Sequence, residues 1–217
     1  MRDKRPLVVV AAVAVVAVVV AVAFALGAFK SDADRARDAV SALMESYVVP
    51  QADEDGNEPA DSPWPAADFG DAATMAVLSA YGVDPEEWHR HCFEHLSYEL
   101  GEASADGDAA TVSVTVTNAS LSAALEVAGA SFTSFSETQD AEDLYAQGGR
   151  AALFAKLVDD VYAGLDADES PVTTTVDVPC RKGEDGAWTP DVAGNAAFFS
   201  ALYGGSDVVS GLAAVAE

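Results

Sequence analysis

The three histidines of the chain, His89, His91 and His95, lie within seven residues of one another. On a helix, His91 and His95 are four residues apart and share one face, so their rings can approach a single metal ion. Cys92 lies about 100° around the helix from His91, and no HExxH motif accompanies the pair. A structural zinc site needs four ligands. We therefore assign no metal ligand and expect the histidines to pair with nearby acids: Glu87, Glu94 or Glu99.

Two groups of carboxylates, at residues 159–160 and 166–169, are the next candidates. A calcium loop needs ligands at spaced positions around a central glycine, and neither group has that pattern. Solvated helix ends are the favoured interpretation. The sequence contains no GxSxG, Walker, HExxH or CxxC motif, so we predict no catalytic residue and no cofactor.

Cys92 and Cys180 are the two cysteines of the chain. In an exported protein a disulfide between them is allowed, and it would close a loop of about 90 residues. A bridge of that length stabilises by roughly 4–5 kcal/mol in the chain-entropy model. Two buried free thiols are the alternative, and the sequence leaves both open.

Residues 7–29 contain ten Val, eight Ala and no charged residue. A helix of these 23 residues spans roughly 34 Å, enough to cross a hydrocarbon core of about 30 Å. Helix is the expected form, because lipid offers no partner to unpaired backbone groups. The stretch therefore predicts a transmembrane signal anchor.

Charges beside this stretch predict its orientation. Residues 1–6 carry three bases against one acid, whereas acids and bases balance just after it. Short basic flanks stay in the cytoplasm, so the N-terminus is predicted to be cytoplasmic and the rest of the chain extracytoplasmic. A cleaved signal peptide is the alternative, because residues 23–25 form a small-x-small site, but the apolar run exceeds the usual length. No cysteine follows the run closely enough to carry a lipid.

The chain is strongly acidic, with 11 Lys and Arg against 36 Asp and Glu. Residues 1–6 hold three of these bases and one acid, which leaves 8 bases, 35 acids and a net charge of −27 for the remainder. Such a charge repels nucleic acid and anionic lipid, so we expect neither as a partner of this part. It attracts cations or basic polymers. Solubility or adaptation to salt is the favoured alternative, because the acids are spread along the chain.

Helical periodicity dominates the first part of the exported region. Residues 31–48 and 68–81 each repeat apolar side chains at three- and four-residue spacing. Ser31 or Asp32 can cap the first helix, and Gly82 stands where a glycine often ends the second. A further helix is expected directly afterwards.

That next helix has a complete start signal, with Asp84 as its cap, Pro85 in its first turn and Glu87 three residues after the cap. Two more helices are predicted later, at residues 121–132 and from about 140 to 165. The Gly148-Gly149 pair weakens the longer one and predicts a break.

Two stretches change to a period of two, which indicates strands. Residues 97–103 and 110–118 flank a turn, and residues 172–180 and 187–189 form a second hairpin before a short helix at 195–203. One face of residues 110–118 is Val and the other Thr and Ser, which suits an antiparallel sheet with one wet face. The order predicts an α+β domain with helices on one face of the sheet.

Packing and turn residues of both hairpins and the last helix carry a resemblance: Tyr98-Glu99-Leu100, Val112, Val114, Val116, Thr117-Asn118, Thr174-Thr175-Val176, Gly186-Ala187-Trp188, Asp191, Asn195, Phe199 and Gly204-Gly205. The pattern resembles uncharacterised exported bacterial proteins, mostly lipoproteins or membrane-anchored, of the nuclear transport factor 2-like (cystatin-like) superfamily. The resemblance covers about residues 33–205 and implies a curved antiparallel sheet wrapped against helices as a cone. It implies no site residue, and this chain lacks the anchoring cysteine of the lipoprotein members.

These patterns lead to an extracytoplasmic domain at residues 30–205, a tail at 206–217, and two candidate functions. The first is a non-enzymatic module that binds a protein, a peptide or another component of the cell envelope. The second is a small-molecule binder or an enzyme that uses the pocket of the cone. A filled cone favours the first function, and an open cavity with convergent polar groups favours the second. The candidate pocket residues are Trp88, His91, His95, Tyr98 and Trp188, and Trp188 is favoured as a core residue.

Overall fold

The structure is a computed structural model that describes residues 30–50, 64 and 68–207. The predicted membrane span at 7–29 and the tail beyond residue 207 lie outside these residues. Within the described part of the chain, no helix is long and apolar enough to cross a membrane.

A four-stranded antiparallel sheet forms the centre of the fold, in the order β1-β2-β3-β4. The strands are β1 (Ser97–Asp106), β2 (Ala109–Ala119), β3 (Pro171–Lys182) and β4 (Trp188–Pro190). The turn between β1 and β2 starts at Gly107, whose φ of 61° suits the first position of a tight hairpin. The predicted α+β class with an antiparallel sheet is confirmed.

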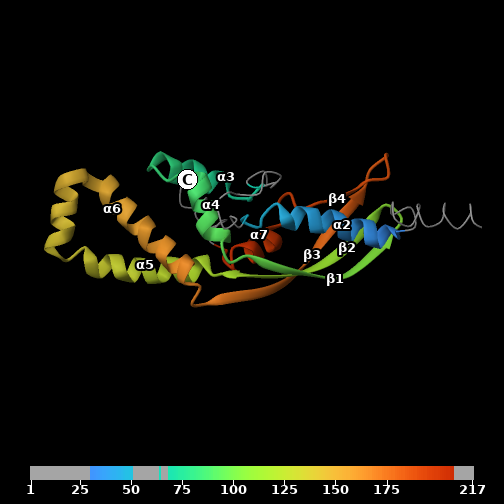
Figure 1. Cartoon of the computed structure of the whole chain (residues 1–217). Coiled ribbons are helices and arrows are strands. Elements are labelled where there is room, and N and C mark those ends of the chain that lie inside the picture. Colours follow the sequence, from blue (N-terminus) through green and yellow to red (C-terminus); the bar gives the residue numbers. More distant parts are fainter. Residues whose placement is uncertain (1–29, 51–63, 65–67, 208–217) are drawn as a thin grey trace, which may run out of the picture.

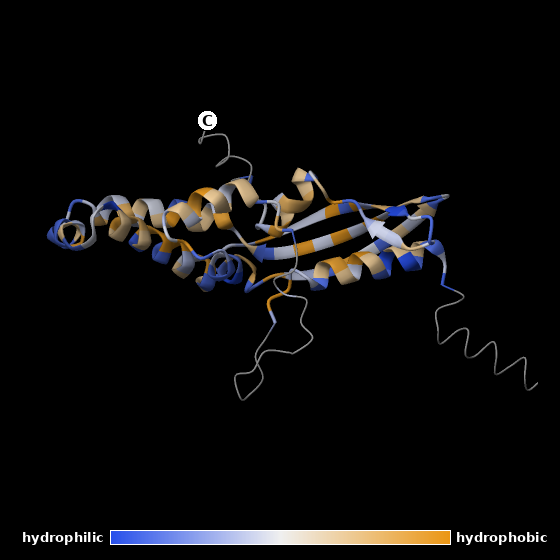
Figure 2. Ribbon diagram, turned by 90° about the horizontal axis from the view of Figure 1, so that it is seen from above, coloured by the Kyte–Doolittle hydropathy of each residue, from blue (hydrophilic) through white to orange (hydrophobic). Residues whose placement is uncertain are grey.

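One face of the sheet is apolar and buried. Val112 pairs with Val178, and Val114 with Val176, so that valines of β2 and β3 line up on this face. Figure 2 shows the resulting alternation of hydrophobic and hydrophilic residues along the strands. This alternation fixes the register, because a shift by one residue would turn every valine toward water.

The opposite face carries hydroxyl pairs between the same two strands. Thr115 Oγ1 lies 2.9 Å from Thr175 Oγ1, and Thr117 Oγ1 lies 2.8 Å from Thr173 Oγ1. Such cross-strand pairs stabilise a sheet by roughly 0.2–1 kcal/mol each. The wet face predicted for β2 is therefore present, and it continues onto β3.

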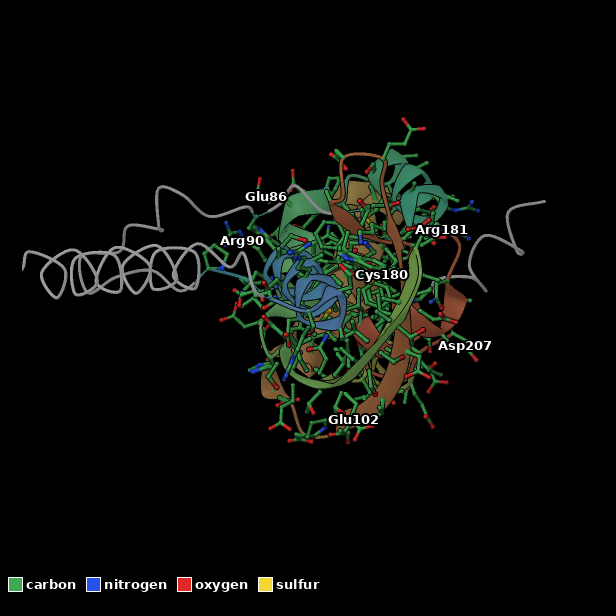
Figure 3. The ribbon with its side chains drawn as sticks, turned by 90° about the vertical axis from the view of Figure 1, so that its right-hand side faces the viewer. Glu86, Arg90, Glu102, Cys180, Arg181 and Asp207 are labelled. Atoms are coloured by element: carbon green, nitrogen blue, oxygen red, sulfur yellow. The ribbon has the colours of Figure 1, made fainter. Side chains whose placement is uncertain are left out.

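Two helices cover the buried face. α2 (Asp32–Glu45) lies inside the curve of the sheet, as the end-on view in Figure 3 shows. Its buried residues Ala36, Val40 and Met44 form one stripe at four-residue spacing. α7 (Ala196–Leu202) packs on β2 and β3. Helices on one face of the sheet were the predicted arrangement.

α3 (Ala72–Ala80) and α4 (Pro85–Phe93) follow α2 in the chain. The Asp84 carboxylate accepts hydrogen bonds from the N–H groups of Glu86 and Glu87 at 2.9 and 3.0 Å, which confirms the predicted cap. α3, however, begins four residues later than predicted. Gly70 has a φ of 71°, outside the range of a right-handed helix, and its close approach to the Phe199 ring of α7 leaves 2.6 Å for a Cβ, so the helix begins only after this residue.

α5 (Leu121–Phe135) and α6 (Gln139–Ala167) form a helical hairpin, here called the arm. Figure 1 shows the arm projecting beyond the sheet, on the side away from the first turn of α2. Gly149 interrupts α6 with φ 63° and ψ −149°, which confirms the predicted break. The geometry is accessible to glycine and strained for other residues.

Candidate functional site

A cleft of about 810 Å³ lies between α4 and the end of α6. Five carboxylates, two histidines and one arginine line it: Asp84, Glu86, Glu87, Glu94, Asp166, His91, His95 and Arg90. Figure 3 labels Glu86 and Arg90 on its α4 side, where they reach the surface of the molecule. The cleft is thus an outer, strongly acidic feature and does not open into the sheet.

Both predicted histidines contact one residue of α6. His91 Nδ1 lies 2.7 Å from Asp166 Oδ1, and His95 Nε2 lies 3.1 Å from the Asp166 carbonyl oxygen. The His91 ring also stacks on Tyr162 at 3.9 Å. α4 ends at Phe93, so His95 lies in the turn after the helix and not on a shared helical face as predicted. The expected pairing with a nearby glutamate is also absent, because both histidines contact Asp166 of α6 instead.

This arrangement limits the chemistry of the cleft. No group of three or more His, Cys, Asp or Glu in the described part of the chain is placed to hold a metal ion. The His91–Asp166 pair resembles the base and orienting acid of a hydrolase, but the lining contains no hydroxyl or thiol to serve as its nucleophile. The excess of carboxylates instead makes a negative potential that concentrates cations.

The five predicted pocket residues do not form one pocket. His91 and His95 line the cleft, and Trp88 is buried behind them with its ring 6.1 Å from that of Tyr162. The Tyr98 hydroxyl donates to Glu45 on α2 at 2.6 Å. Trp188 lies in the core at the far end of the sheet.

Trp188, Lys182 and Asp32 form a small cluster that connects the start of α2 to the hairpin of β3 and β4. Its Nε1–H donates to Asp32 at 3.4 Å, and Lys182 Nζ lies 3.0 Å from the same carboxylate. The hydrogen bond from Lys182 is the main cause of the lowered pKa of Asp32. The preference for a structural role of Trp188 agrees with this position.

A buried polar cluster was not predicted. His89 Nε2 lies 2.9 Å from Asp71 Oδ2, and the Tyr203 hydroxyl donates to the same oxygen at 2.8 Å. All three residues are buried, and Phe69 stacks on the His89 ring at 3.8 Å. Burial raises the pKa of Tyr203 well above its usual value. The sequence offers no local signal for the cluster, because its members come from three separate elements.

The cysteines are buried free thiols, which is the second of the two alternatives that the sequence leaves open. Asn118 Nδ2 donates to the Cys92 carbonyl oxygen at 2.8 Å, whereas Cys180 pairs with Ala110 at the other end of β2. The two positions on β2 are about 26 Å apart at roughly 3.3 Å per residue. A disulfide needs Cα atoms within about 7 Å.

Neither thiol is suited to catalysis. Burial raises the pKa of Cys180 to about 11 and that of Cys92 well above its usual value. A reactive cysteine instead has a lowered pKa and some exposure to solvent. These residues therefore act as small core side chains.

Aromatic side chains fill the space inside the curved sheet. Tyr47, at the end of α2, has its ring 6.2 Å from Phe93 and 5.9 Å from Phe198. Phe93 in turn meets Tyr203 at 5.0 Å. All four of these aromatic residues are essentially inaccessible to solvent. The place where a cone would hold a ligand is occupied by the protein's own core.

Comparisons with known proteins add one likeness. No protein-family profile matches the sequence, and no curated protein matches it. Among solved structures, the chain is similar to a candidate lipoprotein, YcdA, from Bacillus subtilis, with a TM-score of 0.49 and 17% identical residues. The match covers 78% of this chain and 56% of the YcdA chain, so this protein spans little more than half of that length. The predicted superfamily stays a prediction.

Proposed function

We propose that the protein is a membrane-anchored, extracytoplasmic interaction module of the cell envelope, which binds a basic segment of a protein or peptide in the cleft between α4 and α6. The observation that carries this proposal is the lining of the cleft, in which five carboxylates outnumber one arginine and two histidines. A cationic segment is the ligand that such a potential favours.

The arrangement of the domain supports presentation of this cleft away from a membrane. The start of α2, which follows the predicted anchor, contacts Lys182 at one end of the sheet. α4 contacts Asn118 near the opposite end. These ends of β2 are separated by about 26–30 Å, and Figure 1 shows α4 and the first turn of α2 at different ends of the sheet. An anchored domain can therefore hold the cleft well outside the headgroup region.

The alternative function, a small-molecule binder or enzyme working in the cone, has less support. Its ligand would need the interior of the sheet, where Tyr47, Phe93 and Phe198 pack against one another. The buried His89–Asp71 pair lies beside this core, and neither residue lines the acidic cleft between α4 and α6.

Binding of a fluorescein-labelled heptalysine peptide to the full-length protein in non-ionic detergent tests the cleft. We expect anisotropy at 50 mM NaCl to show binding that the Glu87→Gln, Glu94→Gln double variant weakens at least five-fold. The matched control is Glu126→Gln with Glu137→Gln, which removes the same charge from the arm and should change affinity less than two-fold. Equal losses in both variants would mean that the overall charge, and not the cleft, binds the peptide.

The anchor has a separate test. Intact-mass measurement on the membrane fraction should find the whole chain, because an uncleaved signal anchor keeps its N-terminus. A product lacking about the first 25 residues would show a cleaved signal. Full-length protein recovered in the soluble fraction would overturn both the anchor and the placement of the domain.

A further inference from the structure

β3 has an open edge along most of its length. Its residues 180–182 pair with β4, whereas residues 171–179 pair with β2 and with no other strand of the described chain. On the outer side of this stretch, the one backbone hydrogen bond among the described residues runs from the Asp191 N–H to the Pro179 carbonyl oxygen, at 2.7 Å.

The direction of each backbone group follows from two hydrogen bonds. In an antiparallel strand, the N–H and C=O of one residue point to the same side, and neighbouring residues point to opposite sides. The Lys182 N–H donates to Asp108, in the turn between β1 and β2, so it points toward β2. The Pro179 oxygen accepts from Asp191, so it points away from β2, to the side called outward here. The register with β2 runs without a shift, so three residues turn both backbone groups outward: Thr173, Thr175 and Asp177.

This edge is suited to another strand. Six of the seven residues from 172 to 178 are β-branched, and Asp177 is the single charged residue. Prolines at 171 and 179 bound the stretch. The outward-turned residues also have exposed side chains, so three N–H and three C=O groups lie at an accessible edge.

The other edge of the sheet is protected. β1 has a bulge between Leu100 and Ala103, and Arg37 donates to the Leu100 carbonyl oxygen at 2.7 Å. Glu99 and Glu102 add charge to the same strand, and Figure 3 shows Glu102 at the surface. Proteins use bulges and charges of this kind to prevent edge pairing. The contrast singles out β3 as the edge left open.

We infer that residues 172–178 of β3 receive an extended, basic segment of a partner protein, which joins the sheet as an additional strand. This surface is distinct from the cleft between α4 and α6, so the inference goes beyond the function proposed above. The backbone of Thr173, Thr175 and Asp177 provides the hydrogen bonds, and alternate side chains of the segment lie over the wet face of the sheet.

Charge determines the choice of occupant. Asp177 is the last of the three outward-turned residues, toward the β4 end of the edge, and the exported part of the chain carries a net charge of −27 once residues 1–6 are set aside. A segment with Lys or Arg near Asp177 is therefore attracted, whereas a second copy of the chain is repelled. Antiparallel pairing of two β3 edges would also place the two anchored ends at opposite ends of the joined sheet, which does not suit two anchors in one membrane.

Amide hydrogen exchange of the full-length protein in non-ionic detergent gives the first test. We expect the amides of Thr173, Thr175 and Asp177 to exchange rapidly, and those of Thr174 and Val176, which face β2, to exchange slowly. The probe is an acetylated peptide of alternating Lys and Val, nine residues long, which should slow the three outward amides at least ten-fold. Its control alternates Lys and Pro, so it has the same charge but no alternate N–H groups.

Variants that remove an outward N–H without changing the charge separate strand addition from simple charge attraction. Thr175→Pro removes an outward N–H without removing a bond to β2, and it should weaken binding of the Lys-Val peptide at least ten-fold. Thr175→Val loses the hydroxyl contact with Thr115 but keeps the N–H, and it should bind within two-fold of the original protein. If circular dichroism shows that Thr175→Pro does not fold, Thr173→Pro replaces it, because it also removes an outward N–H, with at least a five-fold loss expected.

Several results would overturn the inference. Outward amides that are already protected in the free protein would show that the chain itself covers the edge, and protection that grows with protein concentration would identify a second copy. Equal binding of the Lys-Pro peptide, or unchanged binding by the folded variant, would exclude strand addition. The Glu87→Gln, Glu94→Gln variant should leave exchange at β3 unchanged, so failure of the cleft proposal can be recognised separately.

Discussion

Histidines within two turns of one helix have different structural roles here. His89 lies on the buried side of α4 and pairs with Asp71, 18 residues earlier in the chain. His91 and His95 lie on the cleft side and contact Asp166, more than 70 residues later. Acidic partners from two distant segments therefore fix both sides of α4, which holds the cleft wall in place.

The buried cluster should contribute more to stability than an exposed contact of the same type. Tyr203→Phe removes a hydrogen bond to the buried Asp71 carboxylate, which should lower the free energy of unfolding by about 1.5–3 kcal/mol. Tyr98→Phe removes a comparable bond to Glu45 nearer the surface and should cost less than about 1 kcal/mol. Urea denaturation followed by fluorescence measures both. Equal losses of unfolding free energy in the two variants would show that burial of the Asp71 cluster adds nothing to the strength of its hydrogen bond.

The Cys180 thiol should make the protein sensitive to alkali. Its pKa is about 11 in the folded protein against 9.0 ordinarily, so the unfolded chain loses this proton at lower pH than the folded one. The resulting stability is fully present below pH 9 and is lost as the pH rises through about 11. Chemical denaturation at pH 8, 9.5 and 11 should show a shallower decline for Cys180→Ala than for the original protein. If stability declined equally with pH in both proteins, the Cys180 thiol would not be the cause of the sensitivity to alkali.

Residue spacing could predict part of the candidate site. The close spacing of His91 and His95 predicted that they lie together, and both line the cleft, although α4 ends at Phe93 and His95 lies in the turn that follows. Their partner, Asp166, lies beyond two strands and two helices, and no local pattern connects it to them. The same holds for Asp71 and Tyr203, so side chains that meet through tertiary packing were missed.

Two glycines of the arm have opposite effects on its helices. Gly149 has a positive φ at the break in α6, so the chain turns there because that residue has no Cβ. Gly129 lies inside α5, and a Cβ built there meets no atom within 4 Å. The first glycine is needed by the fold, whereas the second only weakens a helix.

Alanine at these two positions should therefore have opposite effects. Gly149→Ala should destabilise the protein by about 1–3 kcal/mol, because its conformation is strained for a residue with a Cβ. Gly129→Ala should stabilise it by about 0.5–1 kcal/mol, because alanine loses less entropy in a helix. Denaturant midpoints of the two variants provide the comparison. A loss of stability in both would mean that the arm tolerates no added side chain, against the open space at Gly129.

Local signals predicted most of the elements but not all of their boundaries. Periodicity and the Asp84 cap placed the helices, and valine alternation placed β2, because these features depend on neighbouring residues. The late start of α3 and the bulge in β1 depend on contacts with α7 and β2. Boundaries set by such contacts cannot be seen in a window of sequence.

Three regions of the molecule are separated in space. Asp32, at the start of α2, meets Lys182 at one end of the sheet. α4, which lines the cleft, lies near the other end, and the arm extends beyond it (Figure 1). β3 connects these regions, and its open edge runs between them. If the proposed anchor and partners exist, a domain of this form meets a partner at the cleft and at the edge without bringing its acidic surface close to the headgroups.

That acidic surface predicts a response to salt that depends on the whole charge. With a net charge of −25, the folded chain repels itself, and salt reduces this repulsion as the Debye length falls from about 30 Å at 0.01 M to about 3 Å at 1 M. The thermal midpoint should therefore rise by about 2–4 °C across this range, which corresponds to roughly 1 kcal/mol. Circular dichroism of the full-length protein in non-ionic detergent measures the rise.

A charge-reduced variant separates screening from other effects of salt. It replaces five exposed glutamates with glutamine: Glu102, Glu126, Glu137, Glu169 and Glu184. Its midpoint should start higher at low salt and rise less, because less repulsion remains to be screened. An identical rise in both proteins would show that salt acts through hydration of apolar surface, and the dispersed carboxylates would then have no net cost to folding.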